Sequence, residues 1–215
     1  NQFSRSMERL KLVLSIILLG VFLGCDKGAG EFIINGTVTD ATFQTGHAGA
    51  EISLYKIPLA SNNEQFVSSS ILGADGKFQF KVPRERLEKY IIRVNKHLYF
   101  PIEKEIYFSE LKLKEENTYA LSTWAQSWVA LNFVNQNPLS MDHFQYIKQA
   151  GYASCSECCP STVQNFYGAL DTTIYCINKG NTIYSLLYWV LNTPNQGYLE
   201  ANTGAFDTTQ IYLNY

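Results

Sequence analysis

Four cysteines in the C-terminal half are the residues with the clearest chemical potential. Cys155, Cys158 and Cys159 share one short segment, and Cys176 follows it. An even number of cysteines in an exported chain favours disulfide bonds. A bond between the neighbours Cys158 and Cys159 would close a strained ring. We therefore expect Cys155 to bond to Cys158 or to Cys159, and the remaining one of these two to bond to Cys176.

Two other chemistries are compatible with the residue types of this cluster. Cys155 and Cys158 have the Cys-x-x-Cys spacing of zinc ligands, and His143 could serve as a further donor. A redox-active thiol pair has the same spacing but usually lies beside a βαβ unit, which the sequence does not indicate. The second Cys-x-x-Cys pair of a zinc site is missing, and an oxidising compartment disfavours free thiolates. Disulfide bonds are the favoured interpretation, and we predict no metal and no cofactor.

The fifth cysteine, Cys25, ends an uncharged apolar run over residues 12–24 that follows Arg9 and Lys11. The run suits a signal peptide and is shorter than the roughly 20 residues that a spanning helix needs. Its end, Leu23-Gly24-Cys25, resembles the lipobox of bacterial lipoproteins. The resemblance implies cleavage before Cys25, lipidation of its thiol and an acyl chain such as palmitate. An ordinary cleaved signal peptide or an N-terminal membrane helix is the alternative.

These features divide the chain into four parts. Residues 1–24 are interpreted as upstream residues and signal peptide, with Met7 as the initiator, and residues 25–30 as a lipidated tether. Short alternating segments separated by turn residues fill residues 31–120 and 121–215, and the chain is rich in aromatic residues. We therefore predict an all-β fold with two β-sandwich domains.

The first of these domains carries a family resemblance. The segments are Gly36-Thr37-Val38-Thr39-Asp40, Gly49-Ala50-Glu51-Ile52-Ser53-Leu54-Tyr55, Ala74-Asp75-Gly76-Lys77-Phe78-Gln79-Phe80 and Tyr90-Ile91-Ile92-Arg93-Val94. In this order they resemble the carboxypeptidase regulatory-like, transthyretin-like β-sandwich. The resemblance implies a non-catalytic accessory module of an exported protein, often from Bacteroidota, and carries over no catalytic residue. The charged run 84–89 is expected to form a solvated helical turn.

The second domain matches no family known to us, and we expect an immunoglobulin-like sandwich. Strands are predicted over residues 125–135, 182–191 and 209–215, whereas 144–148 could be a strand or a short helix.

Known catalytic motifs are missing: the sequence contains no G-x-S-x-G, H-E-x-x-H, Walker or G-x-G-x-x-G motif. The formal net charge of −2 and the lack of a basic patch argue against nucleic acid as a partner. We therefore predict a non-enzymatic lipoprotein of the bacterial outer membrane, facing the periplasm or the surface. It would offer a binding or assembly surface to another envelope protein, through an edge strand or a loop.

A carbohydrate-binding surface lipoprotein is the alternative hypothesis. Aromatic side chains that could stack on sugars are Trp124, Trp128, Trp189, Tyr152, Tyr167 and Tyr198. Trp128 and Trp189 are interpreted as core residues, and Tyr152 and Tyr198, which we place in Gly-rich loops, are the candidate ligand-binding residues. If Tyr152 and Tyr198 form a coplanar exposed pair, a glycan is favoured. If both are buried, assembly with a protein is favoured.

Overall fold

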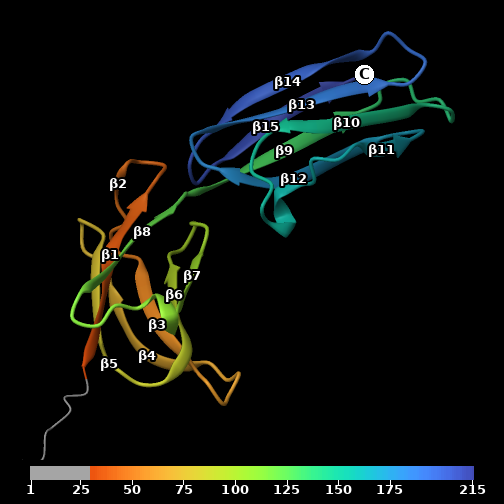
Figure 1. Cartoon of the computed structure of the whole chain (residues 1–215). Coiled ribbons are helices and arrows are strands. Elements are labelled where there is room, and N and C mark those ends of the chain that lie inside the picture. Colours follow the sequence, from red (N-terminus) through yellow and green to blue (C-terminus); the bar gives the residue numbers. More distant parts are fainter. Residues whose placement is uncertain (1–29) are drawn as a thin grey trace, which may run out of the picture.

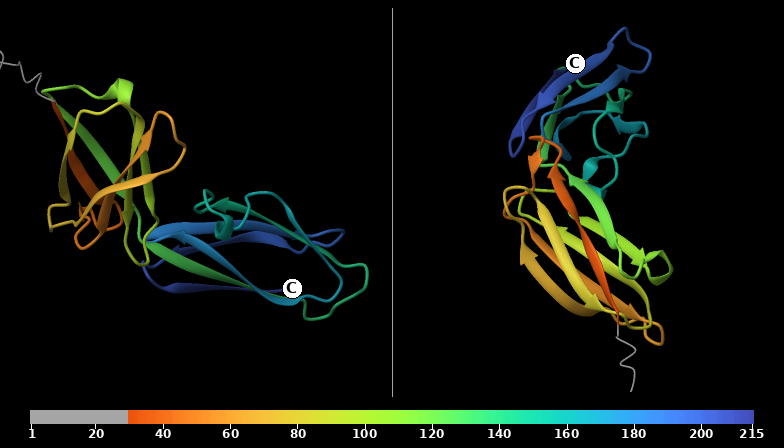
Figure 2. Two further views of the ribbon diagram at one scale, coloured as in Figure 1. Left: turned by 90° about the horizontal axis from the view of Figure 1, so that it is seen from below. Right: turned by 60° about the vertical axis from the view of Figure 1, so that its left-hand side comes forward.

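The computed structural model describes residues 30–215, so the predicted signal peptide and the predicted lipidation site Cys25 lie outside it. The chain forms two β-sandwiches that follow each other along an elongated, bent molecule (Figures 1 and 2). The described helical segments are the short 3-10 helices η1 (Phe108–Glu110) and η2 (Ser156–Cys158). The predicted all-β fold is confirmed. Within residues 30–215, no helix has the length and apolar character needed to cross a membrane.

The first sandwich, residues 31–123, pairs two four-stranded sheets. One sheet is centred on β1 and contains β1 (Glu31–Asp40), β2 (Thr45–Gly46), β5 (Lys77–Pro83) and β8 (Glu116–Thr123). The other has the order β4 (Gln65–Ile71), β3 (Glu51–Pro58), β6 (Leu87–Asn95) and β7 (Ile102–Tyr107). Most pairs are antiparallel, but β1 and β8 are parallel. Strand β8 ends at Thr123, beyond the domain boundary expected after residue 120.

Alternation explains how β5 forms one wall of the first core. Phe78, Phe80 and Val82 are buried, whereas the residues between them are exposed. The turn before the strand needs Gly76, whose φ is +66° and whose position would bring a Cβ within 2.2 Å of the Val38 carbonyl oxygen. The period of two therefore fixes which face of the strand points inward.

The expected helical turn over residues 84–89 is wrong. Strand β6 begins at Leu87, whose side chain is buried in the first core. The Lys89 ammonium lies 2.6 Å from the Glu105 carboxylate on the neighbouring strand β7. Because Leu87 already belongs to the alternating pattern of β6, burying it requires extended backbone rather than a solvated turn.

The second sandwich, residues 126–214, has sheets of three and four strands. The smaller has the order β12 (Asp171–Lys179), β9 (Gln126–Val134) and β15 (Thr208–Asn214). The larger has the order β11 (Gln164–Tyr167), β10 (His143–Ala150), β13 (Thr182–Val190) and β14 (Gln196–Thr203). The segment 144–148 is thus a strand. Between the sheets lies a second core that includes Phe133, Phe144, Tyr146, Tyr184 and Leu186.

A two-residue connection joins the sandwiches, since only Trp124 and Ala125 separate β8 from β9. Phe206 of the second sandwich packs against Tyr99 of the first, with ring centroids 5.4 Å apart. The Lys179 ammonium lies 5.0 Å from the centroid of the Trp124 ring and 4.6 Å from that of Tyr152. Aromatic and cation–π contacts therefore support the junction on two sides.

Candidate binding surface

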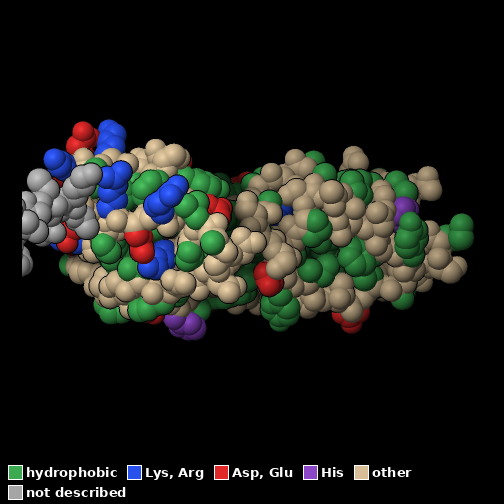
Figure 3. Space-filling model, turned by 60° about the horizontal axis from the view of Figure 1, so that its bottom comes forward, with side chains coloured by type: hydrophobic (Ala, Val, Ile, Leu, Met, Phe, Trp, Pro, Cys, Tyr) green, Lys and Arg blue, Asp and Glu red, His purple; other side chains and the backbone are tan. Residues whose placement is uncertain are grey.

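Charge is distributed unevenly between the two sandwiches. The first carries several ion pairs, among them Arg93 with Glu64 and Glu103. The charged side chains of residues 126–215 are Asp142, Lys148, Glu157, Asp171, Lys179, Glu200 and Asp207. In the view of Figure 3, blue and red side chains gather on the first sandwich, next to the grey residues, whereas the second shows mostly tan and green atoms. The second sandwich therefore presents a largely uncharged surface rich in amides, hydroxyls and aromatic rings.

One row of side chains crosses all four strands of the larger sheet in the second sandwich. In the strand register, Gln145 lies opposite Asn165 on one side and opposite Trp189 on the other, and Trp189 lies opposite Gln196. Leu186 and Val190, which flank this part of β13, belong to the core. Trp189 therefore points to the outer face of the sheet. We call this outer face of β11, β10, β13 and β14 the Trp189 face.

Hydrogen bonds fix the orientation of the side chains in this row. The Trp189 indole Nε1–H donates to Oε1 of Gln145, and Nε2 of Gln145 donates to Oδ1 of Asn165. The His143 Nε2 lies 2.8 Å from the same Asn165 oxygen. An amide oxygen accepts hydrogen bonds, so this contact assigns a proton to Nε2 of His143. The Trp189 ring and the Gln145 and Asn165 amides are therefore each held in one orientation.

Apolar groups surround the row. Leu187 and Tyr198 lie opposite each other on β13 and β14, with 39% and 52% of their surfaces exposed. Together with Trp189 and Gln196 they line a hollow of about 460 Å³. On the other side, Tyr167 stacks on His143 with ring centroids 4.2 Å apart. The face thus combines exposed rings with fixed neutral amides.

Glu200 is the one charged side chain that β10, β11, β13 and β14 present on this face within residues 30–215. The Tyr198 hydroxyl donates a hydrogen bond of 2.6 Å to its carboxylate. Lys148, the only lysine or arginine in these four strands, is buried and points to the other side. The electrostatics of the face therefore disfavour an anionic ligand.

The aromatic candidates from the sequence lie in three places. Trp189, Tyr167 and Tyr198 share the Trp189 face. Trp128 is half-buried in β9 of the opposite sheet. Trp124 and Tyr152 lie at the junction, where Tyr152 packs 4.6 Å from Phe100 and beneath Lys179.

Two expectations about these residues are corrected. Trp128 and Trp189 are not core residues; both are half-buried, because their buried neighbours Val129 and Val190 take the inward positions of the strands. Tyr198 lies in strand β14 rather than in a loop. Tyr152 is half-buried in a loop, and Tyr198 is exposed elsewhere. The two residues therefore form neither the coplanar exposed pair that would favour a glycan nor the buried pair that would favour assembly with a protein.

Sequence reasoning missed the amides Gln145, Asn165 and Gln196. A usable signal exists in β13, where alternation places Leu187 and Trp189 on the face opposite Leu186 and Val190. The scarcity of charge after residue 125 is a second signal. The partners of Trp189, however, come from other strands and depend on the register.

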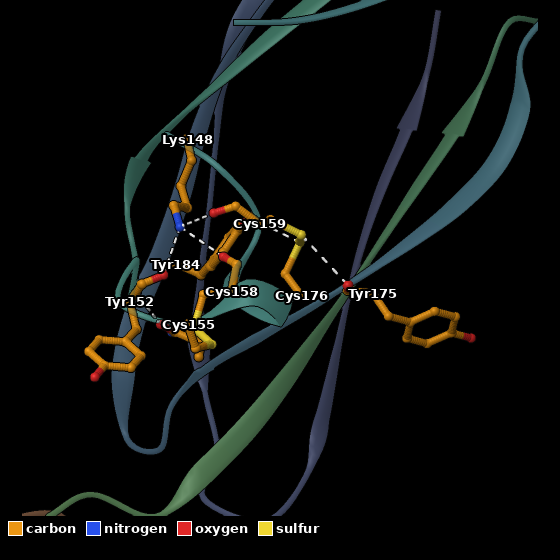
Figure 4. The surroundings of a disulfide bond; sticks show 9 residues. Lys148, Tyr152, Cys155, Cys158, Cys159, Tyr175, Cys176 and Tyr184 are labelled. Carbon is orange, nitrogen blue, oxygen red and sulfur yellow. Dashed lines mark hydrogen bonds between the residues drawn. A yellow bond between two sulfur atoms is a disulfide. The ribbon is translucent and has the colours of Figure 1, made fainter. Parts of the chain in front are cut away.

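The cysteine cluster contains two disulfide bonds, Cys155–Cys158 and Cys159–Cys176 (Figure 4). This is one of the two pairings that the sequence left open. The first bond staples the loop around η2, and the second joins that loop to strand β12. All four sulfur atoms are oxidised, which leaves no thiolate as a zinc ligand. Elsewhere in residues 30–215, no group of three His, Cys, Asp or Glu could hold a metal ion.

Lys148 organises the same loop from the core side. Its buried ammonium donates hydrogen bonds to the carbonyl oxygens of Tyr152 at 2.7 Å, Cys158 at 2.8 Å and Cys159 at 2.6 Å (Figure 4). Burial lowers the pKa of the Lys148 ammonium, because desolvation disfavours its charged form. Each proton of the ammonium has an acceptor, so its contacts indicate a structural role for Lys148.

Comparison with known proteins gives no family assignment. No family model matches the chain, and no curated protein matches its sequence. Among solved structures, the chain is similar to the Bacillus anthracis TIE protein, with a TM-score of 0.38 and 11% identity, over 86% of this chain and 34% of the other. A streptococcal ancillary pilin is similar with a TM-score of 0.34 and 8% identity, over 87% of this chain and 63% of the pilin. The shaft pilin SpaA of Lactobacillus rhamnosus GG is similar with a TM-score of 0.34 and 9% identity, over 84% of this chain and 95% of SpaA. The chain thus spans about a third of the TIE protein and under two thirds of the ancillary pilin.

Proposed function

We propose that this protein is a non-catalytic lipoprotein of a bacterial cell envelope that binds its ligand through the Trp189 face. The observation that carries the proposal is the pair of hydrogen-bonded amides, Gln145 and Asn165, beside Trp189 on a sandwich with few charges. Rigid aromatic side chains give large contact areas at low entropic cost, and amides supply both hydrogen-bond donors and acceptors. Depletion of charge is typical of the centre of a recognition surface.

Export and anchoring are supported by two independent features. Leu23-Gly24-Cys25 resembles a lipobox, and the described part of the chain contains two disulfide bonds. Disulfides form and persist in oxidising compartments such as the periplasm. Acyl chains on Cys25 would hold the protein at a membrane, since two or more chains anchor stably.

The anchor is tested by expressing the chain with its own leader in a bacterial host and measuring the intact mass of the product by mass spectrometry. We expect the protein in the membrane fraction, cleaved before Cys25, with a mass increased by a diacylglycerol and an acyl chain. The Cys25→Ser variant should lack this increase and leave the membrane. An unmodified Cys25 or an uncleaved leader in the wild-type product would contradict the proposed anchoring.

Assembly through an edge strand is a second candidate function, favoured by β4. This outer strand contains neither charge nor proline, and its Phe66 and Ile71 are exposed. The opposite edge, β7, carries Glu103, Lys104 and Glu105. Charged residues and proline are the usual protection of edge strands against pairing with another chain. Strand β4 therefore suits the addition of a partner strand.

Self-pairing of β4 is testable by sedimentation velocity over a range of concentrations. An uncharged strand with Ser68, Ser69 and Ser70 at its centre meets no charge repulsion from a second copy, so we expect a reversible dimer. Ser69→Lys should shift the protein to monomer, and the loop variant Ser161→Lys should not. A wild-type protein that stays monomeric throughout would exclude this assembly.

A further inference from the structure

We infer that the ligand of the Trp189 face is a neutral oligosaccharide. This inference rests on the proposed function, because it names the ligand class of the same surface. Three properties carry it: an aromatic ring held in a fixed plane, amides with free hydrogen-bonding groups beside it, and the absence of a cationic side chain on this face within the described chain.

The fixed ring supplies a platform for the apolar side of a sugar. Trp189 is half-buried, and its indole N–H is already bonded to Gln145, so the ring does not need to be ordered when a ligand binds. A pyranose exposes C–H groups on its faces and hydroxyls at its rim. The C–H groups carry partial positive charge and pack against the electron-rich face of an aromatic ring. Tyr198 and Leu187 extend this platform along β14 and β13.

The amides supply partners for the hydroxyls at the rim. Oδ1 of Asn165 already accepts from Gln145 and His143, which orients its Nδ2 group away from them. Within residues 30–215, neither this Nδ2 group nor the Gln196 amide makes a hydrogen bond. An amide offers both donors and acceptors, which matches a hydroxyl that does both. The free groups lie on either side of Trp189, where the rim of a stacked sugar would reach them.

The charge on the face selects a neutral ligand. The Glu200 carboxylate, which accepts the Tyr198 hydroxyl, is an acidic group on this face and disfavours ligands with carboxylate, sulfate or phosphate groups. The row from Asn165 to Gln196 crosses three gaps between strands, which is about 14 Å at the usual strand spacing. This length exceeds a single sugar ring, so several linked units would be needed to contact the whole row.

A small ligand fits these observations better than a protein. The apolar group formed by Leu187, Trp189 and Tyr198 is bordered by the Gln145 and Gln196 amides, whereas protein contacts usually use larger apolar patches. The hollow of about 460 Å³ beside Trp189 has the size of a pocket for a small molecule. Binding of a protein through this face would contradict the inference.

The test uses the mature lipoprotein, solubilised in a detergent without a sugar head group. It is applied to an array of neutral and anionic oligosaccharides, and bound sugars are titrated by calorimetry. We expect binding to neutral oligosaccharides and none to anionic ones. Trp189→Ala should weaken binding at least about tenfold, as expected for a central aromatic anchor. Tyr198→Ala and Gln196→Ala test exposed positions whose replacement leaves the core intact. Each should weaken binding about threefold or more.

Tyr212→Ala is the matched control, because Tyr212 is 68% exposed on β15 of the opposite sheet. Its sugar affinity should equal that of the wild type. Loss of affinity in Tyr212→Ala, or unchanged affinity in both Tyr198→Ala and Gln196→Ala, would overturn the assignment to this face. Equal binding of anionic sugars would overturn the choice of a neutral ligand.

The same protein, applied to envelope extracts, separates this inference from the proposed function. Capture of an envelope protein that depends on Tyr198, with no sugar bound on the array, would refute the oligosaccharide and retain the proposed binding surface. Sugar binding by a product with an unmodified Cys25 would support the oligosaccharide and refute the anchor.

Discussion

Replacement of Lys148 by Met is expected to destabilise the second sandwich by about 3 kcal/mol or more. The ammonium satisfies three carbonyl oxygens, those of Tyr152, Cys158 and Cys159. Met fills a similar volume but donates no hydrogen bond, so one buried and two part-buried acceptors lose their partner. A buried acceptor without a partner costs about 1–3 kcal/mol. Urea unfolding of the variant, followed by circular dichroism, measures the loss in the free energy of unfolding.

The control for this variant is Lys81→Met, since Lys81 is exposed on β5 of the first sandwich. We expect the control to change stability by less than about 0.5 kcal/mol. Limited proteolysis should cut the loop 151–163 of Lys148→Met faster than that of the control. Equal unfolding midpoints for the two variants would show that the three carbonyl bonds do not hold the loop.

Removal of the Cys159–Cys176 disulfide should cost about 3 kcal/mol, and removal of Cys155–Cys158 about 2 kcal/mol. Cys159 and Cys176 are 17 positions apart in the sequence, whereas Cys155 and Cys158 are 3 positions apart. The longer loop restricts the unfolded chain more, so its loss costs more. Cys159→Ala/Cys176→Ala and Cys155→Ala/Cys158→Ala, compared by urea unfolding under oxidising conditions, measure the difference.

Reduction supplies the control for this comparison. In excess reductant the wild type and both double variants should unfold at similar denaturant concentrations, because the wild type then lacks both bonds. A larger loss for the pair Cys155–Cys158 under oxidising conditions would contradict the loop-length argument. It would instead assign the greater stabilisation to the turn at η2.

Local alternation made most of the fold predictable. In β5, a strict period of two places Phe78 and Phe80 on one face of the strand, and both are buried. The charged residues before Tyr90 concealed the start of β6, where burial of Leu87 outweighs the polarity of its neighbours. The parallel pairing of β1 with β8 joins residues far apart in the sequence, so no local pattern could indicate it.

The candidate surface was predictable in its parts but not in its arrangement. The sequence could name Trp189, Tyr167 and Tyr198 as candidate aromatics, but their shared face depends on strand register. The disulfide pairing was limited to two options by the neighbours Cys158 and Cys159. The turn at η2, with the Cys158 N–H bonded to the Cys155 carbonyl, brings Cys155 and Cys158 within 5.2 Å at their Cα atoms. Cys159 then bonds to Cys176 on strand β12.

The two-residue connection between β8 and β9 has a consequence for avidity. The described chain starts at the end of the first sandwich that is remote from the second (Figure 1). An anchor on Cys25 would thus lift the Trp189 face from the bilayer by the length of the first sandwich. A connection this short behaves as a stiff spacer rather than a flexible linker. Neighbouring anchored copies would present their faces within one layer above the bilayer, where a single polymer can engage several at once and weak individual contacts become a durable attachment.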